Sequence, residues 1–303
     1  MAFEGMQGYD LINAIKAVDP VLAVREQEAI ERMKTYGRIA PVETEFGCAE
    51  QVKGHWRILN LGGRCPREAR DELALWLTDR AEIEDSPDDR DELLGLARDL
   101  ELGLDPAVPR PRHEWVAAGR RYRIVRVDGY ALLGEDGPEP ARHTDTEPIG
   151  PISSVAGFWL DPMAPTTLTE TAVRLELVNQ HPPREAMSDS EWQATIEAIL
   201  GHPGVILLPV CFTGLERLGD DDWDPLVHGD GPQSTRQALA DFLRDELPGL
   251  PVPPEFEAAA RAIESETRPD FTTDGHAFRI ARIIRALRVG PDGPEPPRPH
   301  DEI

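Results

Sequence analysis

Four arginines at repeated positions are the residues of this chain best suited to bind a charged group. They are Arg123, Arg126, Arg279 and Arg282. A guanidinium group presents a planar fork of donors that can hold a carboxylate through two hydrogen bonds. Two interpretations are open. The arginines pair with carboxylates of the chain itself, such as Glu139 and Glu295, or they line a groove that binds an anionic ligand or an acidic peptide.

Two further groups of polar residues could support ion binding, and each has a simpler structural explanation. The glycine turn at 61–66 precedes an expected helix, and backbone amides at a helix start can hold phosphate. The matching stretch at 228–232 carries Asp230, whose negative charge opposes phosphate. Several carboxylates could together hold a hard cation, but aspartates between two strands are typical of a solvated turn. The residues of this acidic run are Asp220, Asp221, Asp222, Asp224, His228 and Asp230.

Nucleophilic catalysis has one weak candidate, Cys48, which could approach His55 or His113 in space. A small buried apolar role is the simpler interpretation for a cysteine. The sequence carries no phosphate-binding loop GxxxxGK[ST], no strand-linked GxGxxG, no HExxH, no GxSxG and no EF-hand loop. It therefore predicts no metal and no organic cofactor, and it favours a protein that is not an enzyme.

Composition indicates a soluble globular protein of two domains, with 303 residues of which 40% are hydrophobic and 29% charged. The formal net charge of −24 repels nucleic acid and anionic membranes. The most apolar stretch, VILLPVCF, is far shorter than the roughly 20 residues of a membrane-spanning helix. The amino terminus lacks a signal-peptide pattern, and three scattered cysteines do not suggest a disulfide framework. We expect the protein to lie in the cytoplasm.

The segments that carry the four arginines match each other along the chain. Residues 119–145 align with residues 275–301 without a gap, at a constant offset of 156. The match places Arg123 on Arg279 and Arg126 on Arg282, and the turn Asp-Gly-Pro-Glu-Pro occurs in both segments. Weaker matches in the same order extend through both halves, so the pattern predicts an internal duplication.

Each repeat is expected to fold as an αββααββ unit, because both copies support the same elements. The predicted helices lie near 24–36 and 88–102 in the first copy and near 190–201 and 254–266 in the second, with a further helix in each copy that opens at Pro66 or Pro232. The predicted strands lie near 38–48 and 55–61, and near 204–213 and 222–228. A β-hairpin ends each unit, turning at Ala118-Gly119 or Asp274-Gly275. Alternation in its second strand predicts apolar residues facing inward and arginines facing outward.

The predicted fold class is α+β, with two tandem copies of a small αββααββ unit related by a pseudo-twofold axis, a pseudo-dimer within one chain. The predicted divisions are an amino-terminal segment (1–22), the first repeat (23–145), a linker with an inserted helix (146–188) and the second repeat (189–303). The inserted helix should begin near Leu168, with Ala172 and Leu175 in its apolar stripe, and should end before His181. Leu11, Ile12 and Ile15 form a comparable stripe in the amino-terminal segment.

Several of these segments resemble an uncharacterised family of actinobacterial proteins catalogued only as a domain of unknown function. The quoted segments are WRILNLGGRCPREARDEL, GRRYRIVRVDGYALLGEDGPEPAR, WLDPMAPTTLTETAVRLEL and FRIARIIRALRVGPDGPEPPRPHD. The resemblance covers about residues 20–303. It implies an actinobacterial origin, a cytoplasmic setting and the duplication, and it implies no activity and no catalytic residues.

The function predicted from the sequence is that of a non-enzymatic cytoplasmic interaction or regulatory protein with a protein partner. One alternative is an enzyme or binder of a small anionic metabolite in the cleft between the repeats. That alternative requires polar residues that converge in only one copy or at the junction. A second alternative is an acidic, antitoxin-like protein that binds a basic protein.

Overall fold

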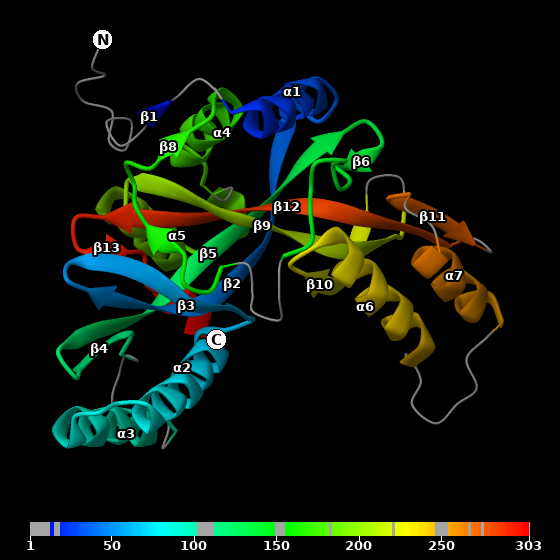
Figure 1. Cartoon of the computed structure of the whole chain (residues 1–303). Coiled ribbons are helices and arrows are strands. Elements are labelled where there is room, and N and C mark those ends of the chain that lie inside the picture. Colours follow the sequence, from blue (N-terminus) through cyan, green and yellow to red (C-terminus); the bar gives the residue numbers. More distant parts are fainter. Residues whose placement is uncertain are drawn as a thin grey trace, which may run out of the picture.

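The protein is a mixed α+β structure in which helices pack around one large antiparallel sheet (Figure 1). The computed structural model describes residues 13–14, 19–101, 112–148, 155–181, 184–219, 222–245, 254–265, 268–273 and 276–302. Seven α-helices lie within these residues. None of the described helices is long and apolar enough to cross a membrane.

The sheet brings strands from both ends of the chain together in the order β10-β9-β12-β5-β2-β3-β7. Its long strands are β2 (Arg38–Val52), β3 (His55–Gly63), β5 (Arg120–Gly134), β9 (Gly204–Arg217), β10 (Trp223–Gly229) and β12 (His276–Gly290). Its short strands are β4 (Glu114–Ala117), β6 (Gly137–Pro138), β7 (Trp159–Leu160), β11 (Asp270–Thr273) and β13 (Gly293–Pro294). The separate pair of β1 (Asn13–Ala14) and β8 (Pro165–Thr166) is parallel.

The two strands that carry the four arginines are neighbours at the centre of this sheet. β5 and β12 run antiparallel, with Val127 opposite Leu287, Gly129 opposite Arg285 and Ala131 opposite Ile283. β2 pairs with the outer edge of β5, and β9 pairs with the outer edge of β12. The centre of the sheet is therefore a junction between residues that are far apart in sequence.

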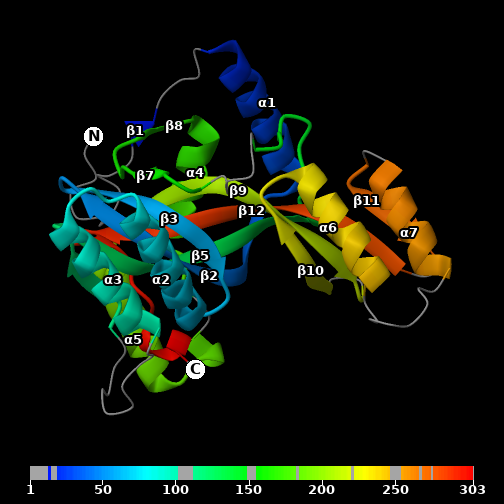
Figure 2. The same ribbon diagram turned by 60° about the horizontal axis from the view of Figure 1, so that its bottom comes forward.

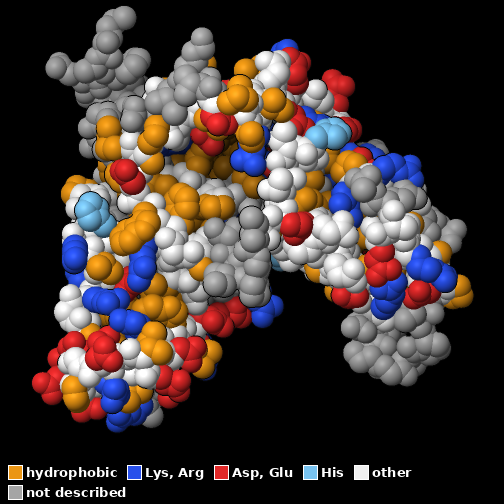
Figure 3. All heavy atoms as spheres, viewed as in Figure 1, with side chains coloured by type: hydrophobic (Ala, Val, Ile, Leu, Met, Phe, Trp, Pro, Cys, Tyr) orange, Lys and Arg blue, Asp and Glu red, His pale blue; other side chains and the backbone are white. Residues whose placement is uncertain are grey.

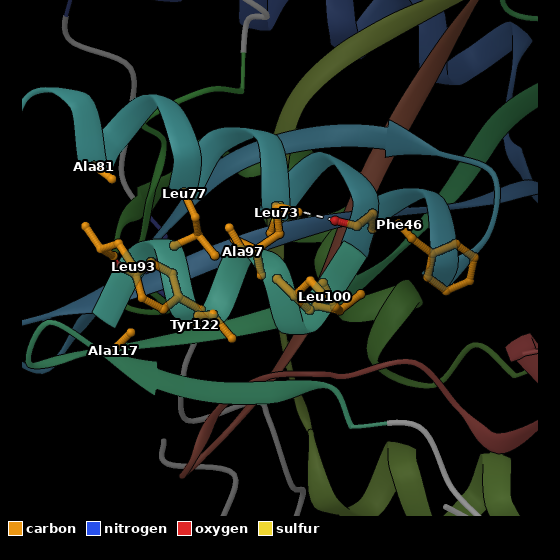
Figure 4. Packing of buried hydrophobic residues seen from close by; sticks show 14 residues of the cluster. Phe46, Leu73, Leu77, Ala81, Leu93, Ala97, Leu100, Ala117 and Tyr122 are labelled. Carbon is orange, nitrogen blue, oxygen red and sulfur yellow. Dashed lines mark hydrogen bonds between the residues drawn. The ribbon is translucent and has the colours of Figure 1, made fainter. Parts of the chain in front are cut away.

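Two helix pairs cover opposite ends of the sheet (Figure 1). The first pair is α2 (Pro66–Glu82) and α3 (Pro87–Glu101), and the second is α6 (Pro232–Asp245) and α7 (Pro254–Ser265). Each of these helices starts with proline, whose missing N–H costs nothing at that position. The first pair packs Leu73, Leu77 and Leu93 against Tyr122 of β5 (Figure 4). The second pair packs Leu239 and Ile263 against Phe278 and Ile280 of β12.

The remaining helices lie on opposite sides of the molecule. α1 (Pro20–Thr35) packs against α4 (Leu168–Val178), whereas α5 (Asp189–Gly201) contacts the carboxy-terminal 3-10 turn (Pro299–Glu302). Figure 2 shows α1 and α4 on one side and α2, α3 and α5 on the other. Thr167 and Glu170 form a capping box at the start of α4, which explains why that helix begins where it does.

The predicted helices and strands agree with the structure within a few residues at most ends. β2 and β9 continue to Val52 and Arg217, several residues beyond their predicted ends. The turn of the first hairpin lies at Ala118-Gly119, where both residues have positive φ (51° and 66°) as the twist of paired strands favours. The second predicted turn, Asp274-Gly275, and the amino-terminal apolar stripe of Leu11, Ile12 and Ile15 lie outside the described residues.

Candidate functional site

Arg123 and Arg279 are buried, so the prediction that the arginine face points outward is wrong. Arg123 is 5% exposed and donates to Glu114 (Nε, 2.8 Å), Asp292 (Nη2, 2.6 Å) and the Pro294 carbonyl (Nη1, 2.9 Å). The turn after β12 covers this face of β5 and supplies those last two acceptors. A strand pattern alone does not reveal such a covering turn.

Arg279 has the corresponding set of partners from the other half of the chain. It donates to Asp270 (Nε, 2.6 Å) and to the Pro138 carbonyl (Nη1, 2.8 Å), and it pairs with Asp136. The guanidinium carbon of Arg279 lies 5.0 Å from the ring centroid of Trp223, and that of Arg123 lies 5.0 Å from that of Trp56. Both arginines therefore hold one half of the chain against the turn of the other.

Glu139 and Glu295, the carboxylates named as partners in the sequence, bind different arginines. Arg142 Nε donates to Glu139 at 2.7 Å, and Arg298 Nε donates to Glu295 at 2.7 Å. The expectation that the chain's own carboxylates neutralise the buried arginines holds for Arg123 and Arg279, but the acceptors are Glu114, Asp292, Asp270 and Asp136 instead.

Arg126 is fully engaged by polar groups of the chain. Its Nε donates to Asp301 at 3.2 Å, its Nη1 donates to Asp128, and its Nη2 donates to Thr44 Oγ1 at 3.0 Å. The Arg126 side chain is 8% exposed. Burial lowers its pKa, but Asp128 and Asp301 more than offset that effect, so the pKa of Arg126 lies above its ordinary value.

Arg282, at the matching position, has far fewer partners. Within the described residues its guanidinium donates one hydrogen bond, from Nε to Asp145 Oδ1 at 3.3 Å. The Arg282 side chain is 15% exposed. Burial and the nearby Arg142 lower the pKa of Arg282, the opposite direction from Arg126, although a guanidinium keeps its charge.

The reason for this difference lies in two residues that differ between the aligned strands. Asp128 aligns with Ile284 at the offset of 156 residues. In the sheet, Phe46 lies opposite Arg126, and Phe212 lies opposite Arg282. Thr44 stands two residues before Phe46, and Val210 stands two residues before Phe212. Thr44 and Val210 therefore occupy corresponding positions beside the two arginines. The two acceptors that hold the Nη atoms of Arg126 are thus replaced by apolar side chains next to Arg282.

A cavity of about 610 Å³ opens beside Arg282, and both replacement residues line it. Its walls come from α1, α4, β5, β9, β12 and the segments that lead into and out of β7. Figure 3 shows the surface hollowed next to α1 and α4, with hydrophobic side chains inside and charged side chains at the margin. Apolar lining residues are Leu22, Ala29, Met33, Leu132, Val173, Ile206, Leu207, Leu208, Val210, Phe212 and Ile284. Six acidic side chains, four arginines and five threonines also line it, so only part of its wall is apolar. Its volume falls in the range of small-molecule sites.

The acidic side chains that line this cavity are held by donors of the chain. Glu26 accepts from Thr169 N at 2.9 Å and from Thr169 Oγ1 at 2.6 Å. Burial raises the pKa of Glu26, but the hydrogen bonds lower it by a larger amount. The net pKa lies below its ordinary value, so the carboxylate stays ionised. Asp145 accepts from Arg142 N at 2.8 Å, and Glu147 accepts from Ser234 N at 3.2 Å. These carboxylates compete less for Arg282 than unengaged ones would.

The other candidates from the sequence have structural explanations. Cys48 is fully buried and its Sγ lies 2.6 Å from Asn60 Oδ1, and burial raises the pKa of this thiol. At the 61–66 turn, the Glu68 carboxylate accepts from Arg64 N at 2.7 Å, where an anion would otherwise bind. Asp220 and Asp221 lie outside the described residues, and the described part of the chain contains no cluster of three metal-ligating side chains. Asp230 instead accepts from Arg285 at 3.1 Å.

The four arginines are equivalent in the sequence pattern, and the structure distinguishes Arg282 from the other three. Ile284, Val210 and Asp145 define its surroundings, and none of the three was predicted to matter. The signal was present in the aligned pair Asp128 and Ile284, because a carboxylate two residues after an arginine on the same strand face is a natural ion-pair partner.

Comparison with curated proteins and with solved structures gives no match. A family model does match, and it covers residues 19–302, nearly the whole described chain. That coverage agrees with the resemblance seen in the sequence, and it assigns no activity. The chain belongs to the Family of unknown function (DUF5954).

Proposed function

We propose that this protein is a non-enzymatic regulatory or interaction protein that binds a small anionic molecule in the cavity beside Arg282. The observation that carries the proposal is the contrast between Arg126 and Arg282. Arg126 uses all three of its guanidinium nitrogens on groups of the chain, whereas the described partner of Arg282 is Asp145 alone. A buried arginine with spare donors beside a cavity is suited to hold an anion.

The cavity has the size that such a ligand requires. Its volume of about 610 Å³ falls within the range of roughly 300–1,000 Å³ that is usual for small-molecule sites. Side chains from both halves of the chain line it, including Met33 of α1 and Ile284 of β12. A molecule bound there would contact both halves, and its binding free energy would stabilise their association.

We also propose that the chain contains two copies of one αββααββ unit, related by a pseudo-twofold axis at the pair Gly129 and Arg285. The offset of 156 residues maps Val127 onto Ile283 and Ala131 onto Leu287. In the sheet, Val127 pairs with Leu287 and Ala131 pairs with Ile283. Exchanging the two halves of the chain therefore turns one of these pairs into the other. The partners of Arg123 and Arg279 exchange in the same way. This symmetry supports a duplication, and Arg282 is then a departure from it.

The cytoplasmic setting, the divisions of the chain and a protein partner belong to the same proposal. The formal net charge of −24 suits a soluble regulator and disfavours nucleic acid as the partner. A ligand that joins the two halves could change the surface offered to a partner, which is how a small molecule can regulate an interaction.

Thermal unfolding in the presence of a library of anionic metabolites tests the binding function. A ligand at 100 times its Kd adds about 2.7 kcal/mol of stability, a shift of the midpoint on the order of 5 °C. Arg282→Met should abolish the shift, and Arg261→Met, at a side chain that is 68% exposed, should preserve it. The proposal is overturned if no anion stabilises the protein, or if the ligand effect survives unchanged in Arg282→Met.

A further inference from the structure

The pair of Arg126 and Asp128 shows that a carboxylate can accept hydrogen bonds from a guanidinium at this position of the strand. Asp128 presents one carboxylate to Nη1 of Arg126, on the same strand and two residues away. Ile284 stands at the matching position beside Arg282 and lines the cavity. The space beside the Nη atoms of Arg282 is therefore bordered by an apolar side chain where the other half of the chain supplies a carboxylate.

The charges around the two arginines differ by one carboxylate. The carboxylates that act most strongly on Arg126 are Asp128, Asp301 and Glu295. The charges that act most strongly on Arg282 are Arg142, Asp145 and Glu139. Arg142 and Arg282 together balance Asp145 and Glu139, so one added negative charge reproduces the arrangement around Arg126. A second negative charge would be buried without a partner, which is costly.

The apolar part of the cavity wall is suited to contact an apolar part of the ligand. Ile206, Leu208 and Val210 of β9, with Leu132 of β5, lie among its walls. Burying a methylene group contributes about 0.8 kcal/mol, or roughly fourfold in affinity. A ligand with one anionic end and an apolar chain or ring would satisfy both the arginine and these walls.

Building on the proposed function, we infer that the ligand is an amphipathic monocarboxylate, an aliphatic or aromatic acid whose carboxylate binds Arg282 as Asp128 binds Arg126. Its apolar body lies against β9 and α4. Its single negative charge gives Arg282 the third neighbouring carboxylate that Arg126 already has. Anions with two charges, such as phosphate monoesters and dicarboxylates, fit this arrangement poorly.

Isothermal titration calorimetry on the full chain tests this inference with a chemical series. The probes are straight-chain monocarboxylates of increasing length, with the alcohol, the alkyl phosphate and the dicarboxylate of matched length. Monocarboxylates should bind, with affinity rising about fourfold per methylene until the cavity is full. The matched alcohol should bind about 10- to 100-fold more weakly, because it lacks the charge-assisted hydrogen bond to Arg282.

Ile284→Asp provides an internal competitor for the ligand. It places beside Arg282 the carboxylate that Asp128 places beside Arg126, so monocarboxylate binding should fall about 100-fold or more. Ile284→Leu keeps the apolar surface and should bind within a few-fold of the unchanged protein. Arg282→Met is a second variant that removes the charge without adding one, and it should bind the acid no better than the alcohol.

The outcomes separate this inference from the proposed function. If alkyl phosphates or dicarboxylates bind and monocarboxylates do not, the ligand class is wrong while an anion site at Arg282 stands. If monocarboxylates bind equally well to Ile284→Asp with its circular dichroism unchanged, the carboxylate does not occupy the predicted position. If no anion binds the unchanged protein, the inference and the proposed function both fail.

Discussion

Arg123 Nη2 donates a hydrogen bond of 2.6 Å to the carboxylate of Asp292, a residue 169 positions away in the chain. The Arg123 side chain is 6% exposed and that of Asp292 is 73% exposed, so the contact joins a buried cation to a surface turn. Arg279 and Asp136 form the matching contact in the opposite direction. Through these contacts each half of the chain covers the buried arginine of the other.

The glycine after Asp292 is required for this covering turn. Gly293 has a φ of 123°, and a Cβ at this residue would lie 2.4 Å from Nε1 of Trp56. Gly293→Ala should therefore lower the free energy of unfolding by about 1–3 kcal/mol. Urea denaturation measures this change.

Gly95 supplies the control for that substitution. It lies inside α3, and a Cβ there meets no atom within 4 Å. Gly95→Ala should stabilise the protein by about 0.5–1 kcal/mol, because alanine has the higher helix propensity. A Gly293→Ala protein as stable as Gly95→Ala would show that the turn does not pack closely on Trp56.

Arg126 and Arg282 should contribute very differently to stability, although they occupy matching positions. Arg126→Met leaves Asp128 and Asp301, with side chains 18% and 8% exposed, without their cation, and it should cost about 3–5 kcal/mol. Arg282→Met removes the cation from one carboxylate, Asp145, instead of two, and through one longer hydrogen bond of 3.3 Å, so its cost should be nearer 1–2 kcal/mol. Equal losses in urea denaturation would contradict the contrast from which the binding site was inferred.

Glu45 should make the protein less stable as the pH rises from about 4.5 to 7. Burial raises the pKa of Glu45 to about 7, and the attraction of Arg285 offsets only part of that effect. The folded protein then binds a proton that the unfolded chain releases near pH 4.5, so stability is lost between about pH 4.5 and 7. The loss specific to this group is on the order of 3 kcal/mol.

Glu45→Gln removes the ionisable group and keeps its shape, so that part of the pH dependence should disappear. Glu31→Gln, at a side chain that is 56% exposed, is the matched control and should leave the profile unchanged. Urea denaturation at pH 5, 6, 7 and 8 measures both variants. If Glu45→Gln and the unchanged protein lose the same stability over this range, Glu45 is ionised in the folded state.

Much of the fold could be predicted from local sequence, because local signals determine it. Pro66 and Pro232 mark helix starts, and the alternation from Arg120 to Val127 marks a strand. Burial of the arginines could not be predicted, because it depends on a turn that approaches from the other half of the chain. Local alternation reveals which residues share a face of a strand, and it contains no information about what covers that face.

The candidate site was predicted only in part, for a related reason. The sequence pattern identified Arg282 as a candidate ligand-binding residue. Its position beside a cavity depends on Val210 of a different strand and on side chains of α1 and α4 that line the cavity. The pairing register between β9 and β12 is known only from the folded sheet, so the sequence could not show that Val210 lies near Arg282. Only the difference between Asp128 and Ile284 is visible from the sequence, in the alignment of residues 119–145 with 275–301.

The most direct test of the account is an NMR titration that observes the arginine Nε–H groups while octanoate is added. The signal of Arg282, assigned through Arg282→Met, should shift and saturate with the ligand. The signal of Arg126, assigned through Arg126→Lys, should stay unchanged because Asp128, Asp301 and Thr44 already bind that side chain. An Arg282 signal that does not move, or one that moves together with that of Arg126, would contradict the claim that Arg282, and not Arg126, is available to hold an anion.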